Sequence, residues 1–170
     1  VEPMVSVAYR FALAAVILLL FCRLKGLNLK FSLKDHFFMA VLGGLLFSFN
    51  YWLVYTAELY LTSGLVAILF SSIVFLNIAN GSIFLGAPME KAVVAGAVIG
   101  IFGIVLIFMP EVRAFNLSDK GMLGLLLGMG SVFLASLGNI TSARNTKNNI
   151  PVIQANAFGM AYGAVLLAVI

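Results

Sequence analysis

The stretch Leu61–Leu85 reads LTSGLVAILFSSIVFLNIANGSIFL and holds no charged side chain over its 25 residues. A helix needs about 20 mainly apolar residues to cross the hydrocarbon core of a bilayer. A strand of a membrane barrel would instead alternate between lipid-facing and lumen-facing side chains over about ten residues, and this stretch does not alternate. The stretch therefore predicts a helix that spans a membrane.

The same pattern recurs on both sides of this stretch. Hydrophobic residues make up 63% of the chain and charged residues 9%, against about 45–50% and about 25% in soluble domains. That composition excludes an ordinary cytosolic enzyme, a disordered chain and a disulfide scaffold. We expect an all-α membrane protein, a polytopic bundle of six transmembrane helices. The other five apolar runs are Met4–Cys22, His36–Ala57, Ala92–Met109, Gly121–Ala143 and Val152–Ile170.

The charged residues fall mainly in the connections between these runs. Alternate connections lie on the same side of the membrane, and the first, third and fifth together hold seven Lys and Arg, against two in the second and fourth. Short loops rich in Lys and Arg stay in the cytoplasm. We therefore expect the odd connections inside and residue 1 outside. The +4 net charge is spread over these loops, so we expect the lipid bilayer as a partner and no nucleic acid.

Small residues recur at helical spacing in three of the runs. In lipid, two small residues four apart let helix backbones approach closely, and internal packing and a homodimer through these faces both remain open. The first and sixth runs share a weak similarity and lie five helices apart, an odd offset that inverts the second copy, as in many transporters. The spaced pairs are Gly96-x-x-x-Gly100, Gly124-x-x-x-Gly128 and Gly159-x-x-x-Gly163.

Several motifs, taken in order, resemble EamA-type proteins of the drug/metabolite transporter superfamily. They are Pro3 followed by Tyr9-Arg10, then Asn50-Tyr51-Trp52, Tyr55-Thr56-Ala57 and Tyr60-Leu61-Thr62-Ser63-Gly64, then Phe84-Leu85-Gly86 with Gly96, Gly100 and Gly103, and finally the glycine-rich run from Gly121.

The resemblance implies ten helices in two inverted five-helix repeats in a cell membrane, with the bacterial inner membrane favoured. Residues 1–120 would then correspond to helices two to five of the first repeat, and residues 121–170 to helices six and seven. The chain starts with Val1 beside an apolar run and ends inside another, so we expect an internal piece of a longer protein. It departs from the family at Ala87, where a Glu usually follows Leu-Gly; here the acid is Glu90, three positions on. The run before it also lacks the proline often found in helix four.

Two charged residues in or beside the apolar runs are candidates for function. Arg10 lies about 10 Å along its helix from Pro3, and a charge at that depth by default marks a cavity or a pair. It is a candidate for attracting an anionic part of a substrate. The structural alternatives are an ion pair within the protein and a side chain that snorkels outward. Glu58 ends the second run and is a candidate for proton coupling, for an ion pair with Arg10, or for a solvated loop charge.

Polar and aromatic side chains inside the runs supply further candidates for substrate binding. Asn50, Trp52 and Tyr55 would suit an amphipathic metabolite, and hydrogen bonding between helices is the alternative reading. Asn77 and Asn80 lie three residues apart, so they share a helix face. They could line a cavity or permit close packing.

The sequence predicts neither catalytic residues nor a bound cofactor. It contains no phosphate-binding Gly-x-x-x-x-Gly-Lys-Ser/Thr motif, and its one Cys and one His cannot make a cysteine- or histidine-rich metal site. The resemblance implies a secondary transporter that exports small metabolites or drugs by alternating access, with a small-molecule substrate. A non-transporting helical subunit of a membrane complex is the alternative.

Overall fold

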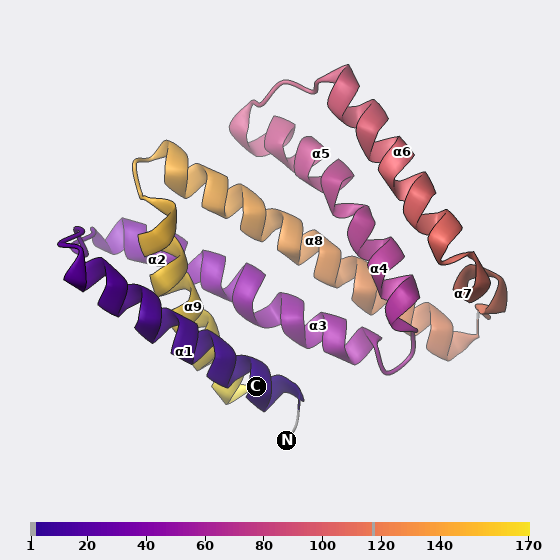
Figure 1. The fold of residues 1–170 in the computed structure, drawn as a ribbon, viewed down its shortest axis with the longest axis horizontal. Coiled ribbons are helices and arrows are strands. Elements are labelled where there is room, and N and C mark those ends of the chain that lie inside the picture. The colour runs from indigo at the N-terminus through magenta and orange to yellow at the C-terminus, as the bar shows by residue number, and fades with distance from the viewer. Residues whose placement is uncertain (1–2, 117) are drawn as a thin grey trace. The chain divides into compact units, whose positions relative to one another are not determined.

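The computed structural model describes residues 3–116 and 118–170, and these residues form helices and turns without a strand (Figure 1). The chain divides into two compact units, Val1–Trp52 with Leu137–Ile170, and Leu53–Ser136. The elements in chain order are α1 Pro3–Leu24, α2 Leu33–Gly44, the π-helix η1 Leu45–Phe49, α3 Asn50–Ala57, α4 Ser63–Ser71, α5 Ile73–Leu85, α6 Lys91–Ile107, α7 Met109–Ala114, α8 Asp119–Lys147 and α9 Val152–Val169.

The all-α membrane fold is confirmed. In the described part of the chain, five helical segments are long and apolar enough to cross a membrane. The remaining run, Ala92–Met109, forms α6, which at 17 residues spans about 25 Å at 1.5 Å per residue. Helix α6 ends at Ile107, and the short helix α7, with Pro110 in its first turn, begins at Met109. The five long segments are Met4–Leu24, Leu33–Ala57, Ser63–Leu85, Lys120–Lys147 and Val152–Val169.

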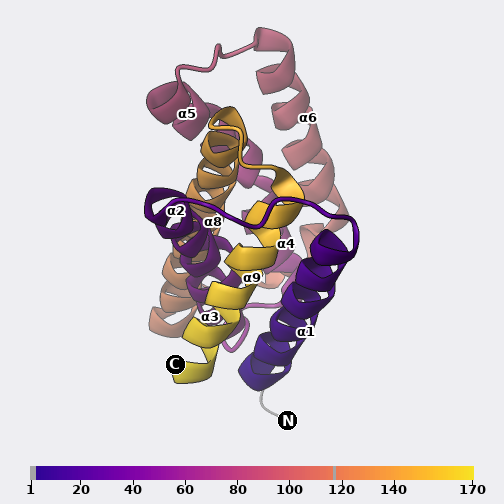
Figure 2. The same cartoon turned by 90° about the vertical axis from the view of Figure 1, so that its left-hand side faces the viewer.

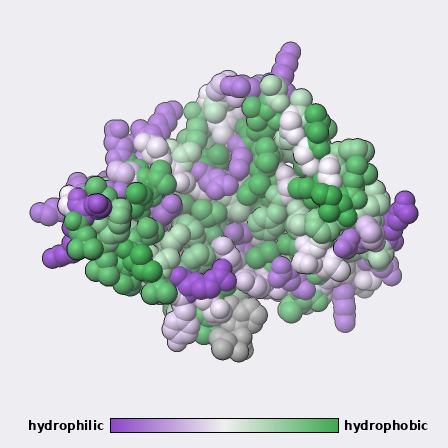
Figure 3. Space-filling model, viewed as in Figure 1, coloured by the Kyte–Doolittle hydropathy of each residue, from purple (hydrophilic) through white to green (hydrophobic). Residues whose placement is uncertain are grey.

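Large apolar side chains cover much of the exposed surface, as the green areas of Figure 3 show on one face. Leu13 of α1, Ile83 of α5 and Phe102 of α6 are each more than 60% exposed. A monomeric soluble protein rarely exposes so much contiguous apolar area. These surfaces are suited to lipid or to the faces of other helices.

The first unit is built around α9, which packs against both α1 and α2. Figure 2 shows α9 between these two helices. Phe11 of α1 makes edge-to-face contacts with Phe47, at 5.2 Å between ring centroids, and with Tyr51, at 4.9 Å. Such aromatic pairs add to the apolar contact area of the core. They hold α1 against the helix formed by η1 and α3.

The closest approach in this unit is between α2 and α9. An added Cβ at Gly43 would collide with the carbonyl oxygen of Gly159 and would lie 3.0 Å from the nitrogen of Gly163. Only the missing side chain lets the two backbones meet this closely. The Gly159-x-x-x-Gly163 spacing therefore serves internal packing.

The run predicted as one uniform helix, His36–Ala57, contains a π-helical segment, η1. An added Cβ at Gly163 would lie 2.7 Å from the Cβ of Phe47, so η1 sits directly on the glycine face of α9. Ser48 of η1 is fully buried, and its hydroxyl has no hydrogen-bond partner among the described residues. Short π-segments inside helices are frequent at functional sites.

One end of the first unit is tied together by polar and aromatic contacts. His36 at the start of α2 shares a hydrogen bond with Tyr162 of α9, at 2.9 Å between Nδ1 and the hydroxyl oxygen. The guanidinium of Arg144, near the end of α8, lies 3.4 Å from the ring centroid of Phe38. A cation over an aromatic face is stabilised by the ring quadrupole. These contacts join α2, α8 and α9.

The second unit contains α4 to α7 and the first part of α8. The apolar run Leu61–Leu85 forms α4 and α5, with a break at Ser72. The hydroxyls of Ser71 and Ser72 donate to the carbonyls of Ile68 and Leu69, each at 2.6 Å. Such side-chain bonds to the preceding turn compete with the helix ladder and bend helices. Helix α6 packs against α4 and α5.

Candidate functional site

The predicted site residues are divided between the two units. Arg10, Asn50 and Trp52 belong to the first, and Tyr55, Glu58, Asn77 and Asn80 to the second.

In the first unit, Asn50 and Trp52 have different surroundings. Asn50 is buried, and its amide donates to the carbonyl of Leu46 at 3.4 Å, across the π-helical segment. Trp52 is 41% exposed. Its ring borders a cavity of about 480 Å³, together with Tyr9 of α1 and Leu167 of α9. Aromatic and apolar walls of this kind suit the apolar part of a small molecule.

Arg10 lies on the exposed side of α1, whereas its neighbour Phe11 faces the core of the unit. It does not line the cavity beside Trp52. A long basic side chain on an outward helix face can extend its charge towards a polar region while its stem covers apolar surface. The substrate role of Arg10 stays a prediction.

In the second unit, Asn80 joins two helices. Its side chain is buried, and its amide donates to the hydroxyl of Ser136 on α8, at 2.9 Å. Model peptides and membrane proteins place such interhelical bonds at about 0.6–2 kcal/mol. This bond gives Asn80 a structural task, the attachment of α5 to α8.

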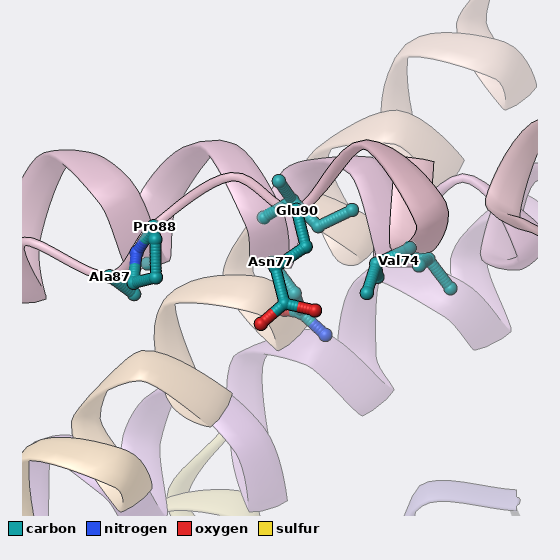
Figure 4. Close-up of a pocket in the computed structure, with 8 residues that line it drawn as sticks. Val74, Asn77, Ala87, Pro88 and Glu90 are labelled. Atoms are coloured by element: carbon teal, nitrogen blue, oxygen red, sulfur yellow. The ribbon is translucent and has the colours of Figure 1, made fainter. Parts of the chain in front are cut away.

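Asn77, one turn earlier on α5, lines an open hollow of about 520 Å³. Figure 4 shows the carboxylate of Glu90 in the same hollow as Asn77, with Pro88 and Ala87 along the connection and Val74 on α5. Asn77 and Asn80 therefore lie in different surroundings, although they are only three residues apart. The hollow combines one amide and one carboxylate with apolar walls.

The local chain path explains how Glu90 reaches α5. Helix α5 ends at Leu85, and the φ of 65° at the next residue, Gly86, lies in the left-handed region that favours glycine. The amide of Gly86 donates to the carbonyl of Ser82, at 3.2 Å, which closes the helix end. The extended residues that follow bring Glu90 to the start of α6 and alongside Asn77.

Glu90 is not among the site residues predicted from the sequence. The available signal was the departure from the family pattern at Ala87, with the acid displaced by three positions. The sequence shows that Ala87 occupies the usual position of the acid, but it does not show where the side chain of Glu90 lies. The side chain's place in the hollow depends on the turn after Gly86.

The remaining two candidates lie near one end of α3. Tyr55 is half-buried on that helix, and Glu58 is exposed just beyond its last residue, Ala57. The amide of Glu58 donates to the carbonyl of Val54 at 2.9 Å, so the helical path continues to this residue. An exposed carboxylate at a helix end fits a solvated position, and a proton-coupling role for Glu58 stays a prediction.

Metal coordination finds no support among the residues described. No group of three or more His, Cys, Asp and Glu side chains lies close enough there to hold an ion. Cys22 is buried and unpaired by disulfide in α1. The lining of the hollow at Asn77 offers one amide, one carboxylate and apolar contact, and the lining of the cavity at Trp52 is aromatic and apolar.

The sequence profile of the EamA-like transporter family matches residues 1–109 of the chain. No curated protein and no solved structure gives a significant match.

Proposed function

Because the chain belongs to the EamA-like transporter family, we propose that it is a secondary transporter that exports small metabolites or drugs from the cytoplasm by alternating access. The family match carries this proposal, since it spans more than half of the chain. The five helical segments long enough to cross a bilayer, found within the described residues, support a multi-pass membrane protein. We place it in the cell membrane, with the bacterial inner membrane favoured.

One feature of the sequence bears on the proposed energy source. The chain has no phosphate-binding Gly-x-x-x-x-Gly-Lys-Ser/Thr motif, which an ATP-driven motor in this chain would need. We propose coupling to a proton gradient or facilitated diffusion. Glu58 is the candidate proton carrier, with Arg10, Asn50, Trp52, Tyr55 and Asn77 as candidates for contact with substrate.

The packing of α2 and η1 on α9 bears on the proposed movement. The backbones of Gly43 and Gly159 meet directly at this crossing, with the side chains of Leu42, Phe47 and Tyr162 packed around them. In many transporters one repeat rocks against the other and exposes the site to alternate sides. We propose that α9 and α2 move as a packed pair in such a step.

A second reading, a helical subunit that binds another membrane chain, rests on α6. An added Cβ at Gly96, Gly100 or Gly103 would find no described atom within 4 Å. This face is open for a partner helix, and a homodimer through it belongs to this reading. The two readings are compatible if the partner is a second copy of the transporter.

An export profile tests the proposed function. We would express the full reading frame that encodes this chain in a transport-deficient bacterial host and measure which metabolites accumulate outside the cells. The variants are Arg10→Ala and Glu58→Gln, with Arg113→Ala on the exposed side of α7 as the matched control. We expect export by the wild type and the control, and its loss in one or both site variants. Export of nothing across a broad panel, with folded protein in the membrane, would contradict the proposal.

A further inference from the structure

The hollow beside α5 has an unusual balance of charge. Of the eight described residues that line it, Asn77 and Glu90 alone carry polar side chains, and Glu90 alone carries a charge. The others, such as Val74, Ile78 and Val93, are apolar or glycine. One negative charge therefore faces an apolar space with no basic side chain in its lining.

The carboxylate is also not used by the helix that it precedes. Glu90 is the N-cap residue of α6, where an acidic side chain commonly accepts hydrogen bonds from the first free amides. In the described structure its side chain makes no capping hydrogen bond. Figure 4 shows it turned towards Asn77 instead. Its acceptor oxygens are directed into the hollow rather than at the helix end.

These features select the kind of molecule that would bind. Glu90 is exposed in this open hollow, so its attraction for an opposite charge is partly screened by solvent, and apolar contact with the walls would add to it. An anion there would be repelled by the carboxylate. The volume of about 520 Å³ lies within the range of about 300–1,000 Å³ typical of small-molecule sites.

We propose that the hollow between α5 and α6 binds an amphipathic organic cation, with its charged group at Glu90 and Asn77 and its apolar body against Val74 and Val93. This inference rests on the proposed transport function and names a substrate class for it. The charge count of the loops predicts that the connection before α6 lies on the cytoplasmic side. An exporter would load its substrate on that side.

Direct binding tests this proposal. We would purify the protein from its full reading frame in dodecyl maltoside, an uncharged detergent, and measure equilibrium binding of tetraphenylphosphonium and tetraphenylborate. These two probes have nearly the same shape and opposite charge. We expect saturable binding of the cation alone, at least tenfold weaker in Glu90→Gln and partly retained in Glu90→Asp. The matched control, Glu111→Gln, removes one carboxylate of the same unit outside the hollow and should bind as the wild type does.

Three results would overturn the proposal. They are equal affinity of wild type and Glu90→Gln for the cation, equal binding of the borate, and no cation binding by protein that exports neutral or anionic compounds. The last result would leave the proposed function intact. Cation binding that is lost in Glu90→Gln, in a protein that exports nothing, would support the site and contradict the transport function.

Discussion

Two helices of this protein carry the same small-residue spacing and use it differently. On α9, Gly159 and Gly163 lie against α2 and η1, where the Cβ of Phe47 would be 2.7 Å from an added Cβ at Gly163. On α6, Gly96 and Gly100 have no described atom within 4 Å of the same added Cβ. One glycine pair is filled by its own chain, and the other is open.

Small-residue spacing allows close helix contact, but it does not determine whether a partner helix packs there. Glycine four residues apart permits close helix contact, but in lipid there is no hydrophobic force between helices to bring a partner there. On α9, the partner surface is supplied by Gly43 and by the backbone of η1. On α6, α4 and α5 pack elsewhere on the helix, so its glycine face is left for lipid or another chain. Adding one methyl group at each of four glycines tests this distinction.

The largest effect is expected for Gly43→Ala. The new methyl would collide with the carbonyl oxygen of Gly159, which is backbone and cannot rotate away. Overpacking of this kind costs about 1–3 kcal/mol, and we expect the upper part of that range. The measurement is the apparent melting temperature of the purified protein in dodecyl maltoside. An unchanged melting temperature would contradict the expected difference between α9 and α6, because the contact of Gly43 with Gly159 would then not affect stability.

A somewhat smaller loss is expected for Gly163→Ala on the opposite helix. Its methyl would lie 2.7 Å from the Cβ of Phe47 and 2.9 Å from the carbonyl oxygen of Gly43. We expect about 2 kcal/mol of destabilisation, read by the same thermal assay. The double variant with Gly43→Ala should cost less than the sum, since the two changes act on one contact. Full additivity would show that the two glycines act at separate contacts.

A small loss is expected for Gly128→Ala on α8. Its methyl would meet the Cδ1 of Leu69 at 2.6 Å, which is the far end of a flexible side chain. The leucine can change rotamer, so we expect a cost below about 1 kcal/mol. A loss as large as that of Gly43→Ala would show that Leu69 is held as rigidly as backbone. The cost of an added methyl group would then depend on the contact distance alone, and not on whether the contacted atom belongs to backbone or to a side chain.

The smallest effect is expected for Gly100→Ala on α6. No described atom lies near the added methyl, and alanine favours the helix over glycine by about 1 kcal/mol. We expect an equal or higher melting temperature for the monomer. Cross-linking in membranes would show whether this change, or the bulkier Gly100→Leu, removes a partner. A clear loss of thermal stability would mean that the face is covered in the native protein.

The positions of the helices could be predicted from the sequence because the segments that lie in lipid are long and apolar, and mean hydropathy measures this directly. All six apolar runs form helices, with α6 shorter than its run. The break at Ser72 and the π-segment at Leu45–Phe49 were not predicted. Both depend on local hydrogen bonding and on the packing of α9, and neither changes the mean hydropathy of its run. The repeat boundary at residue 121 stays a prediction.

The candidate site was predictable only in part. The spacing of Asn77 and Asn80 indicated a shared polar face, but only the structure places Asn80 against Ser136 and Asn77 in the hollow. Glu90 was missed because its position depends on the left-handed turn at Gly86. For Arg10 the sequence left a cavity, an ion pair and a side chain that snorkels outward open, and the residue lies on an exposed helix face. Charge and depth along a helix do not determine the direction in which a side chain points.

Counterflow shows directly whether the protein moves solutes across a membrane. Protein made from the full reading frame would be reconstituted into liposomes that hold a high concentration of an unlabelled compound from the export profile. The external solution would contain the same compound, labelled. We predict transient accumulation of label above equilibrium, because a carrier that alternates between two sides exchanges one solute for another. Entry of label no faster than in protein-free liposomes, with protein of normal melting temperature, would contradict the account.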